Sequence, residues 1–376
     1  MKIALFDSEA TLDGAQRFLL DLAGGLLARC WEVVAVLGEE GPLRKALQQR
    51  GVSVTVIPLP EGRGRWKAIP RLASFFHHED AHRLFANSLP AALYGGLAMR
   101  LAGGHTCRRL YLPGELTAVR SHARLAARIC AQVHAAFPLT PEELHLLPGH
   151  RTRLRMLPPG IDLSAFPAHK PPVMKRNERP VIGIIDYWEP ANGQDMLVKA
   201  FRLLHATGVA ARLRLASPVG CSIEQERYRA VVQSAVKASG LADRIIFEGE
   251  ITDLPGFLAR CHLVVAPSLG ETTGRLALEA AAIGRPVVAS RLANLSEIVE
   301  DGHTGLLVPP NDSRAMADAL ALLLASPALR AEMGRQARLH AESTFALGPY
   351  LDALEDQFLG KPAEVWGMER ENDLTG

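Results

Sequence analysis

Short apolar runs alternate with segments of helical periodicity along this chain of 376 residues, and the alternation occurs twice. Apolar runs of strand length separated by helical patterns are typical of a mostly parallel sheet. In the first half we expect strands at residues 3–6, 33–37, 52–57, 84–86, 109–112 and 133–137, and helices at 15–28, 43–49, 90–101 and 117–129. In the second half we expect strands at residues 181–185, 212–216, 245–248, 263–266, 287–290 and 305–308. The sequence therefore predicts an α/β protein with two Rossmann-like sheets.

A proline-rich connector separates the two halves. Residues 157–180 contain six prolines, and residues 170–179 are nearly devoid of apolar side chains, as in a linker. We expect two such sheets to face one another across a cleft, because open parallel sheets bind ligands at the carboxyl ends of their strands. The predicted boundaries are residues 1–160 for an acceptor-side domain, 161–180 for the linker, 181–345 for a nucleotide-sugar domain and 346–376 for a C-terminal helix and tail.

Composition excludes several classes of protein. The formal net charge is only +2, from 42 basic and 40 acidic residues, so we expect no nucleic-acid partner. The five cysteines lie far apart and never at the spacing of metal ligands, which favours a reducing compartment without a zinc site. No apolar run reaches the roughly 18 residues that a membrane span needs. We therefore expect a cytoplasmic protein, at most peripheral to the inner face of a membrane.

The segment from Pro267 to residue 280 contains the most specific pattern in the chain. An apolar strand is expected to end at Pro267, a polar turn with glycine follows, and a helix of good helix formers begins near Thr273. The first backbone amides of a helix have no partner within it, and they favour anions. We therefore expect a diphosphate site at the amides of Gly274, Arg275 and Leu276.

Two carboxylates flank this predicted site. Glu271 comes just before the helix and Glu279 about two turns into it, which separates them by roughly 10 Å. This spacing suits a sugar at one end of a ligand and a ribose at the other. The alternative is that Glu271 caps the helix and Glu279 is a solvated helix residue.

Together with three further motifs, this segment resembles family 4 of the glycosyltransferases, whose members are retaining enzymes of the GT-B fold. The three motifs are residues 13–17 (DGAQR), 159–166 (PGIDLSAF) and 296–312 (SEIVEDGHTGLLVPPND). The resemblance implies that Glu279 binds the ribose of a donor and that Glu271 binds its sugar as the catalytic residue. It also implies that the amides of residues 274–276 bind the diphosphate and that Gly14 approaches it from across the cleft.

The resemblance further implies the reaction. A sugar would pass from a nucleoside diphosphate sugar to a hydroxyl of a glycan, lipid-linked or small-molecule acceptor, as in polysaccharide biosynthesis. The donor base would lie near Gly249, Glu250 and Ile251. No Asp-x-Asp motif occurs in the chain, which agrees with a metal-free mechanism without a cofactor other than the donor substrate.

The chain departs from the family at two positions. Tyr187 stands where an arginine is expected and Asn192 where a lysine is expected, so both usual phosphate-binding cations are replaced. Losing two cations beside a leaving diphosphate would cost several kcal/mol of transition-state stabilisation unless they are replaced. Arg275 could be the replacement, or it could be a solvent-facing arginine of the first helical turn. These departures keep a second hypothesis open, a catalytically silent GT-B-like binding or regulatory protein.

Basic and aromatic side chains also alternate in residues 63–78. Trp66, Phe75 and Phe76 are interleaved there with arginine and lysine. One interpretation is contact with an anionic membrane or a lipid-linked acceptor. The other is a helix that packs on the core through its apolar face and carries a basic face toward solvent.

Overall fold

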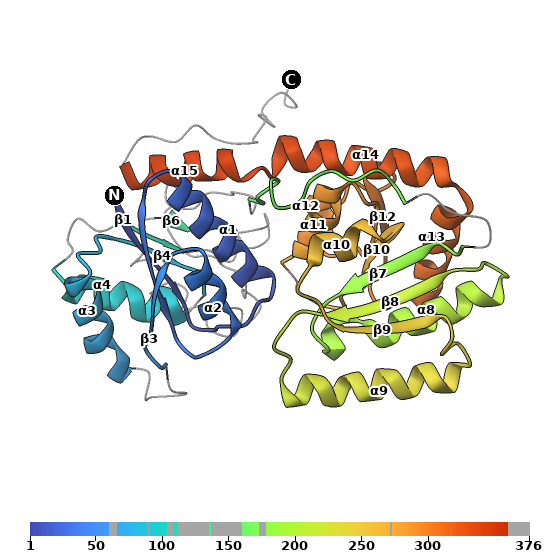
Figure 1. The fold of residues 1–376 in the computed structure, drawn as a ribbon, viewed down its shortest axis with the longest axis horizontal. Helices are drawn as coiled ribbons and strands as arrows, with labels where there is room; N and C mark the ends of the chain where they lie inside the picture. The colour runs from blue at the N-terminus through green and yellow to red at the C-terminus, as the bar shows by residue number, and fades with distance from the viewer. Residues whose placement is uncertain are drawn as a thin grey trace, which may run out of the picture.

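The computed structural model describes residues 1–59, 66–88, 90–103, 108–111, 135–136, 160–172, 178–270 and 273–359. These residues form two α/β units, each built on a six-stranded sheet (Figure 1). Every strand pair in both sheets is parallel. The predicted α/β architecture with two parallel sheets is confirmed.

The first sheet has β1 near its centre. Ile3 and Leu5 of this strand pack against one hydrophobic cluster, whereas Ala4 and Phe6 pack against another on the opposite face. A strand that is buried on both faces must be apolar throughout, which explains why β1 is a continuous apolar run. The sheet order is β3-β2-β1-β4-β5-β6. Its strands are β1 (Lys2–Asp7), β2 (Glu32–Leu37), β3 (Ser53–Val56), β4 (Arg83–Ala86), β5 (Arg108–Tyr111) and β6 (Ala135–Ala136).

Helices cover both faces of this sheet. One face is covered by α1 and α2, and the other by the helices that follow β3 and β4. The single helix expected at residues 90–101 is a π-helical turn that continues as an α-helix. The described helices of this unit are α1 (Gly14–Ala28), α2 (Pro42–Gln49), α3 (Ile69–His78), η2 (Ala91–Gly95) and α4 (Gly96–Leu101).

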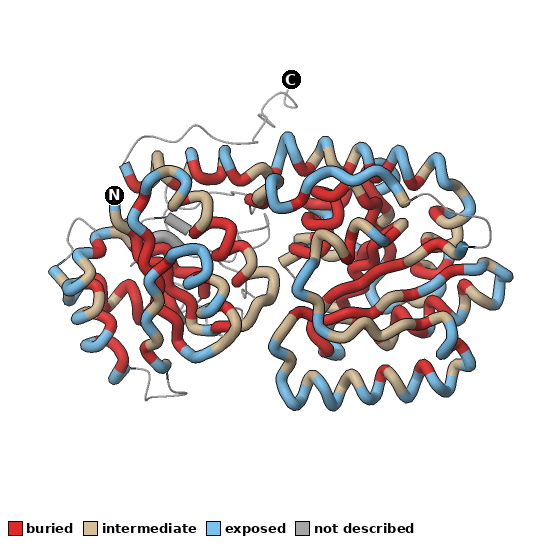
Figure 2. The backbone as a smooth tube through the Cα atoms, viewed as in Figure 1, coloured by how far each residue is buried: buried red, intermediate tan, exposed pale blue. Residues whose placement is uncertain are grey.

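The second sheet repeats this arrangement, with β7 near its centre and the order β12-β11-β10-β7-β8-β9. Its strands are β7 (Val181–Ile185), β8 (Arg212–Ser217), β9 (Ile245–Glu250), β10 (Leu263–Ala266), β11 (Val287–Ser290) and β12 (Gly305–Val308). One large hydrophobic cluster forms its core, as the band of buried backbone in Figure 2 shows. The helices are η4 (Pro190–Asn192), α8 (Gln194–Ala206), α9 (Ile223–Ser239), α10 (Leu254–Ala259), α11 (Arg275–Ile283), α12 (Ala293–Ile298), α13 (Ser313–Ala325) and α14 (Pro327–Thr344).

The chain crosses between the units twice, and the two crossings are hydrogen-bonded to each other. The N–H of Ile161 donates to the carbonyl of Phe345 over 2.8 Å, and the N–H of Leu347 donates to the carbonyl of Ile161 over 3.0 Å. The second crossing leads into α15 (Leu347–Leu359), which returns to the first unit and packs on α1 (Figure 1). There Tyr350 meets Phe18 edge to face, with ring centroids 5.1 Å apart.

The connector packs against the second unit. Arg285, which is buried, donates hydrogen bonds to the carbonyls of His169 and Lys170. The N–H of His169 in turn donates to the carbonyl of Ile283. Among the helices in the described part of the chain, none combines the length and the apolar character that a bilayer crossing requires.

Candidate functional site

A cavity of about 230 Å³ lies between the two units, at the carboxyl ends of β1 and β7. In each sheet the strand order reverses beside this central strand, so that neighbouring loops diverge and leave a crevice. The first unit lines the cavity with residues that include Asp7, Asp13, Gly14, Gln16, Arg17 and Asn87. The second unit contributes residues that include Asp186, Tyr187, Asn192, Thr273, Arg275 and Leu276.

The amino termini of α1 and α11 face one another across the cavity. Gly274 precedes α11 with a φ of +67°, a left-handed conformation that glycine adopts without strain. Gly14 opens α1, and a methyl group there would overlap the Thr273 hydroxyl and come within 2.8 Å of the Cβ of Arg275. Both helix termini direct the positive ends of their dipoles toward this point, which favours an anion.

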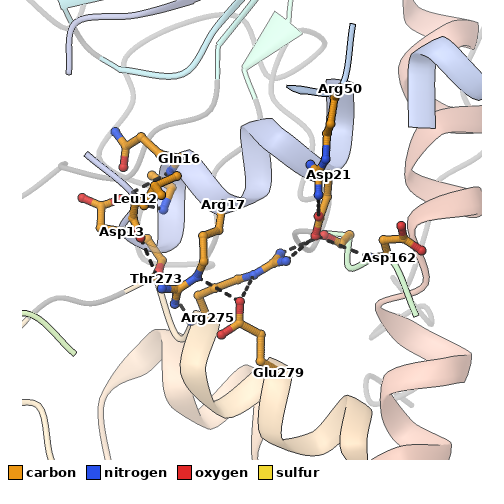
Figure 3. Close-up of polar contacts among 12 residues, drawn as sticks. Leu12, Asp13, Gln16, Arg17, Asp21, Arg50, Asp162, Thr273, Arg275 and Glu279 are labelled. Carbon is orange, nitrogen blue, oxygen red and sulfur yellow. Dashed lines mark hydrogen bonds and ion pairs between the residues drawn. The ribbon is translucent and has the colours of Figure 1, made fainter. Parts of the chain in front are cut away.

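Glu279 lies behind the wall of the cavity: it is completely buried, with 0% of its surface exposed, and its two hydrogen-bond donors, Arg17 and Arg275, line the cavity. Its Oε1 accepts a hydrogen bond from Nε of Arg17 at 3.0 Å and another from Nε of Arg275 at 2.9 Å. Arg275 also forms an ion pair with Asp21 of α1 and donates to the carbonyl of Gly160 (Figure 3). The network therefore joins α1 and Gly160 of the first unit to α11 of the second.

From the sequence, Arg275 could be either a cation that binds phosphate or a solvent-facing residue, and the structure shows a third arrangement. It is only 4% exposed, so the solvent-facing interpretation is wrong. All three of its guanidinium nitrogens donate to protein groups, so none of them faces the cavity as a free cation. Burial opposes its charge, but Asp21 and Glu279 outweigh burial and raise the pKa of Arg275. The Arg275 side chain lies between the two units because its carboxylate partners come from both of them. Glu279 is one turn further along α11, and Asp21 is on α1 of the first unit.

Tyr187 and Asn192, the two positions where the resemblance leads us to expect cations, both line the cavity. The Tyr187 hydroxyl accepts from the N–H of Leu12 at 3.0 Å and donates to the carbonyl of Val219 at 3.3 Å, which ties the two units together. Burial raises the pKa of Tyr187 to about 12, so the group is neutral. The Asn192 amide donates to the carbonyl of Tyr187 at 2.9 Å. Neither side chain supplies a positive charge.

Two aspartates that sequence reasoning missed stand at the ends of the central strands. Asp7 accepts hydrogen bonds from the side chains of Gln16 at 3.0 Å and Asn87 at 2.7 Å, and burial raises the pKa of Asp7 to about 6. Burial also raises the pKa of Asp186 to about 7. Each follows the last apolar residue of a predicted central strand, and that position is the signal that could have identified them.

The three residues expected near the donor base lie two strands away from β7. Gly249 has a φ of +76° at the end of β9, where the register to β8 shifts. The Glu250 carboxylate accepts from the amides of Gly220 at 2.9 Å and Cys221 at 3.3 Å, so it orders the loop after β8. The N–H of Ile251 donates to the carbonyl of Ser217. Contact of these residues with a base stays a prediction.

Other predicted site residues fall outside the structure's description or away from the cavity. Glu271 belongs to residues 271–272, which lie outside the described residues, as do residues 63–65. Trp66 is 54% exposed and stands edge to face against Tyr94, whereas Phe76 is buried in the core. Within the described ranges, no three His, Cys, Asp or Glu side chains are grouped as metal ligands would be.

Comparison with known protein families gives two matches that together span most of the chain. The model of Glycosyltransferase Family 4 matches residues 12–165, and the model of Glycosyl transferases group 1 matches residues 179–326. The chain is 34% identical over 225 residues to a D-inositol 3-phosphate glycosyltransferase of Acidothermus cellulolyticus, covering 54% of this chain and 49% of the relative. It is 40% identical over 116 residues to the lipopolysaccharide core biosynthesis mannosyltransferase LpcC of Rhizobium leguminosarum, covering 31% and 33%. The chain thus matches about half of the first relative's length, and a third of the second's.

Solved structures match over nearly the full chain. HepE of Anabaena in complex with UDP-glucose superposes with a TM-score of 0.81 at 20% identity, covering 96% of this chain and 100% of HepE. The sucrose-phosphate synthase of Thermosynechococcus elongatus superposes with a TM-score of 0.75 at 20% identity, covering 96% and 99%. These likenesses confirm the GT-B fold.

Proposed function

The chain belongs to the family 4 glycosyltransferases, and from this premise we propose that it transfers a sugar from a nucleoside diphosphate sugar to an acceptor hydroxyl. The observation that carries the proposal is the cavity where the first turns of α1 and α11 face one another, with the buried Glu279 bonded to two arginines of its lining. Two helix amino termini favour a diphosphate, and a carboxylate beside them accepts hydrogen bonds from a ribose diol. A nucleoside diphosphate carries both groups.

The comparisons support a nucleotide-sugar donor. HepE is described in complexes with UDP and with UDP-glucose, and its fold superposes on this chain over nearly its whole length. The named relatives are glycosyltransferases, so the alternative of a catalytically silent protein is not favoured. In the proposed site, the amides of residues 274–276 and Gly14 bind the diphosphate, while Gly249, Glu250 and Ile251 lie beside the base.

The chemistry we propose retains the configuration of the transferred sugar and uses no metal ion. Glu271 acts at the donor sugar, and the dipoles of α1 and α11 neutralise part of the charge on the leaving diphosphate. The acceptor is a hydroxyl of a glycan, a lipid-linked precursor or a small molecule. If this is right, activity persists in the presence of a chelator, whereas loss of activity with rescue by manganese or magnesium would reject a metal-free reaction.

A binding screen followed by a transfer assay tests the proposal. Isothermal calorimetry with uridine, adenosine and guanosine diphosphates and their glucose conjugates should identify a donor, and the release of nucleoside diphosphate should depend on an added acceptor. Glu279→Gln should weaken the nucleotide roughly ten- to a hundred-fold, because it removes a charged hydrogen-bond acceptor. Glu332→Gln, at an exposed glutamate of α14, is the matched control and should leave binding unchanged. Binding of no nucleotide in the wild-type protein would reject the proposed function.

We also propose peripheral contact with the inner face of a membrane through the exposed Trp66 and the basic residues Lys67 and Arg71 that follow it in the sequence. All three side chains are exposed in the structure. An exposed tryptophan among cations favours an anionic lipid surface. Co-sedimentation with phosphatidylglycerol vesicles, but not with phosphatidylcholine vesicles, should decrease in Trp66→Ala. Equal sedimentation of the variant and the wild type would exclude this surface.

A further inference from the structure

Two arginines line the cavity among the described residues, and their hydrogen bonding differs. Arg275 uses all three guanidinium nitrogens in contacts with Asp21, Gly160 and Glu279. Arg17 uses two, because Nε donates to Glu279 at 3.0 Å and Nη1 donates to the carbonyl of Leu12 at 3.3 Å. In the described part of the chain, Nη2 of Arg17 has no hydrogen-bond partner. Arg17 is also the more accessible of the two, at 20% against 4% exposure.

We propose that Arg17 is the cation that binds the donor diphosphate, and that in doing so it leaves Glu279 and makes this carboxylate available to the ribose. The inference rests on the proposed function, because it names a residue of the same donor site. Arg17 would supply the positive charge at the diphosphate that the neutral side chains of Tyr187 and Asn192 do not supply. Arg17 is thus a positioning residue for Glu279 as well as a ligand of the diphosphate.

The position of Arg17 meets the requirements of this role. It lies in the first turn of α1, three residues after Gly14, and its side chain points across the cavity to the first turns of α11 (Figure 3). A guanidinium can bind phosphate oxygens through two parallel N–H groups, which makes arginine a strong ligand of a diphosphate. No other described cavity residue offers such a group, since Arg275 is held on both sides.

The exchange leaves no buried charge without a partner. In the structure Oε1 of Glu279 accepts from both arginines, whereas Oε2 is buried without a hydrogen-bond partner. When Arg17 leaves, Arg275 still neutralises Glu279, and the ribose hydroxyls replace the hydrogen bond that Arg17 made. Removing one member of a buried pair is costly only where the other charge is left alone. Arg17 itself exchanges one anionic partner for another.

Other charged groups act on Arg17 from both units. Asp13, from the turn before α1, and Asp186, at the end of β7, interact electrostatically with it, and each has its pKa raised by burial and lowered by Arg17. Any negative charge on these carboxylates attracts the Arg17 guanidinium. They do not provide the hydrogen bonds that a diphosphate would, because the recorded contacts of Arg17 go to Glu279 and Leu12.

The test compares a nucleoside diphosphate with its nucleoside, using the diphosphate that binds the wild-type protein most tightly. In Arg17→Gln we expect the affinity for the diphosphate to fall at least ten-fold. The nucleoside should bind equally well or more tightly, because the ribose no longer competes with Arg17 for Glu279. Arg44→Gln removes a partly exposed arginine of α2 outside the cavity and controls for the loss of one positive charge.

The outcomes separate the two proposals. If the wild-type protein binds no nucleotide, the proposed function fails. If the wild-type protein binds a nucleotide, the role of Arg17 is overturned when Arg17→Gln lowers the affinities for the diphosphate and the nucleoside equally. It is also overturned when Arg17→Gln lowers neither affinity. Should Arg17→Gln fail to fold by circular dichroism, Arg17→Met decides, because it keeps most of the apolar stem but removes the positive charge. A ratio of diphosphate to nucleoside affinity within two-fold of wild type in Arg17→Met would then reject the inference, whereas a ratio lowered at least ten-fold would support it.

Discussion

Replacement of Arg275 by methionine tests whether the buried ion network holds the two units together. Methionine keeps most of the length and the apolar stem of the side chain but removes the guanidinium. Glu279 and Asp21 then remain buried on opposite units, and the carbonyl of Gly160 loses its donor. An ion pair on the surface would contribute only about 0 to 1 kcal/mol to the free energy of unfolding. A larger loss in Arg275→Met would therefore reflect the burial of its ion pairs.

The magnitude follows from the charges that stay behind. Breaking a buried ion pair by removing one partner costs about 3 to 5 kcal/mol. Glu279 retains Arg17 at 3.0 Å, and Asp21 retains Arg50 at 3.8 Å, so each residual charge keeps one partner. We therefore expect the free energy of unfolding to fall by about 3 kcal/mol, at the lower end of that range.

Urea unfolding followed by circular dichroism measures this loss for Arg275→Met, Asp21→Asn and the double variant. The two changes remove the same ion pair, so the double variant should be more stable than the sum of the single effects predicts, by at least about 1 kcal/mol. Arg335→Met is the control, because Arg335 pairs with Glu332 on the exposed surface of α14 and should change stability by less than about 0.5 kcal/mol. A loss in Arg275→Met as small as in this control, or strictly additive effects, would refute a stabilising network.

Three further perturbations address the cavity. Burial raises the pKa of Asp186 to about 7 from 3.8, so the folded protein holds more protons than the unfolded chain between these values. Stability should therefore fall as the pH rises through this window. In urea titrations, the stability of Asp186→Asn relative to wild type should increase by about 4 kcal/mol between low pH and pH 8. Tyr187→Phe removes the hydroxyl between Leu12 and Val219 and should cost about 1 to 2 kcal/mol of unfolding free energy in the same assay. Gly14→Ala should separate the units, seen as a larger radius of gyration in X-ray scattering with unchanged circular dichroism. The first argument would be contradicted if the stability difference between Asp186→Asn and wild type did not change with pH. The second would be contradicted by an unchanged unfolding free energy in Tyr187→Phe, and the third by an unchanged radius of gyration in Gly14→Ala.

The strands could be predicted from the sequence because burial on both faces makes a parallel strand a continuous apolar run. The interval predicted at residues 181–185 coincides with β7, and the one at 263–266 coincides with β10. Of the interval predicted at residues 133–137, the structure describes Ala135–Ala136, and both residues belong to β6. The π-helical turn in η2 has no periodicity that a helical pattern of 3.6 residues would reveal.

The candidate site could be predicted only where one local segment determines it. The turn at Gly274 and the start of α11 follow from strand, glycine and helix formers in sequence. The burial of Arg275 does not, because its partner Asp21 lies 254 residues earlier in the chain. The same holds for Arg17 and Glu279, which are 262 residues apart. Pairing between two separate units leaves no signal in the spacing of either residue's neighbours.

The return of α15 to the first unit has a consequence for synthesis on the ribosome. The hydrophobic cluster around α1 and α2 includes Leu347, Leu351, Leu354 and Phe358. The first unit therefore leaves the exit tunnel long before the helix that covers this apolar surface, whereas the second unit's core is assembled from residues 161–345 alone. Domains usually fold in the order in which they emerge. In this chain the amino-terminal unit emerges first, yet its apolar face around α1 stays uncovered until α15 has been synthesised.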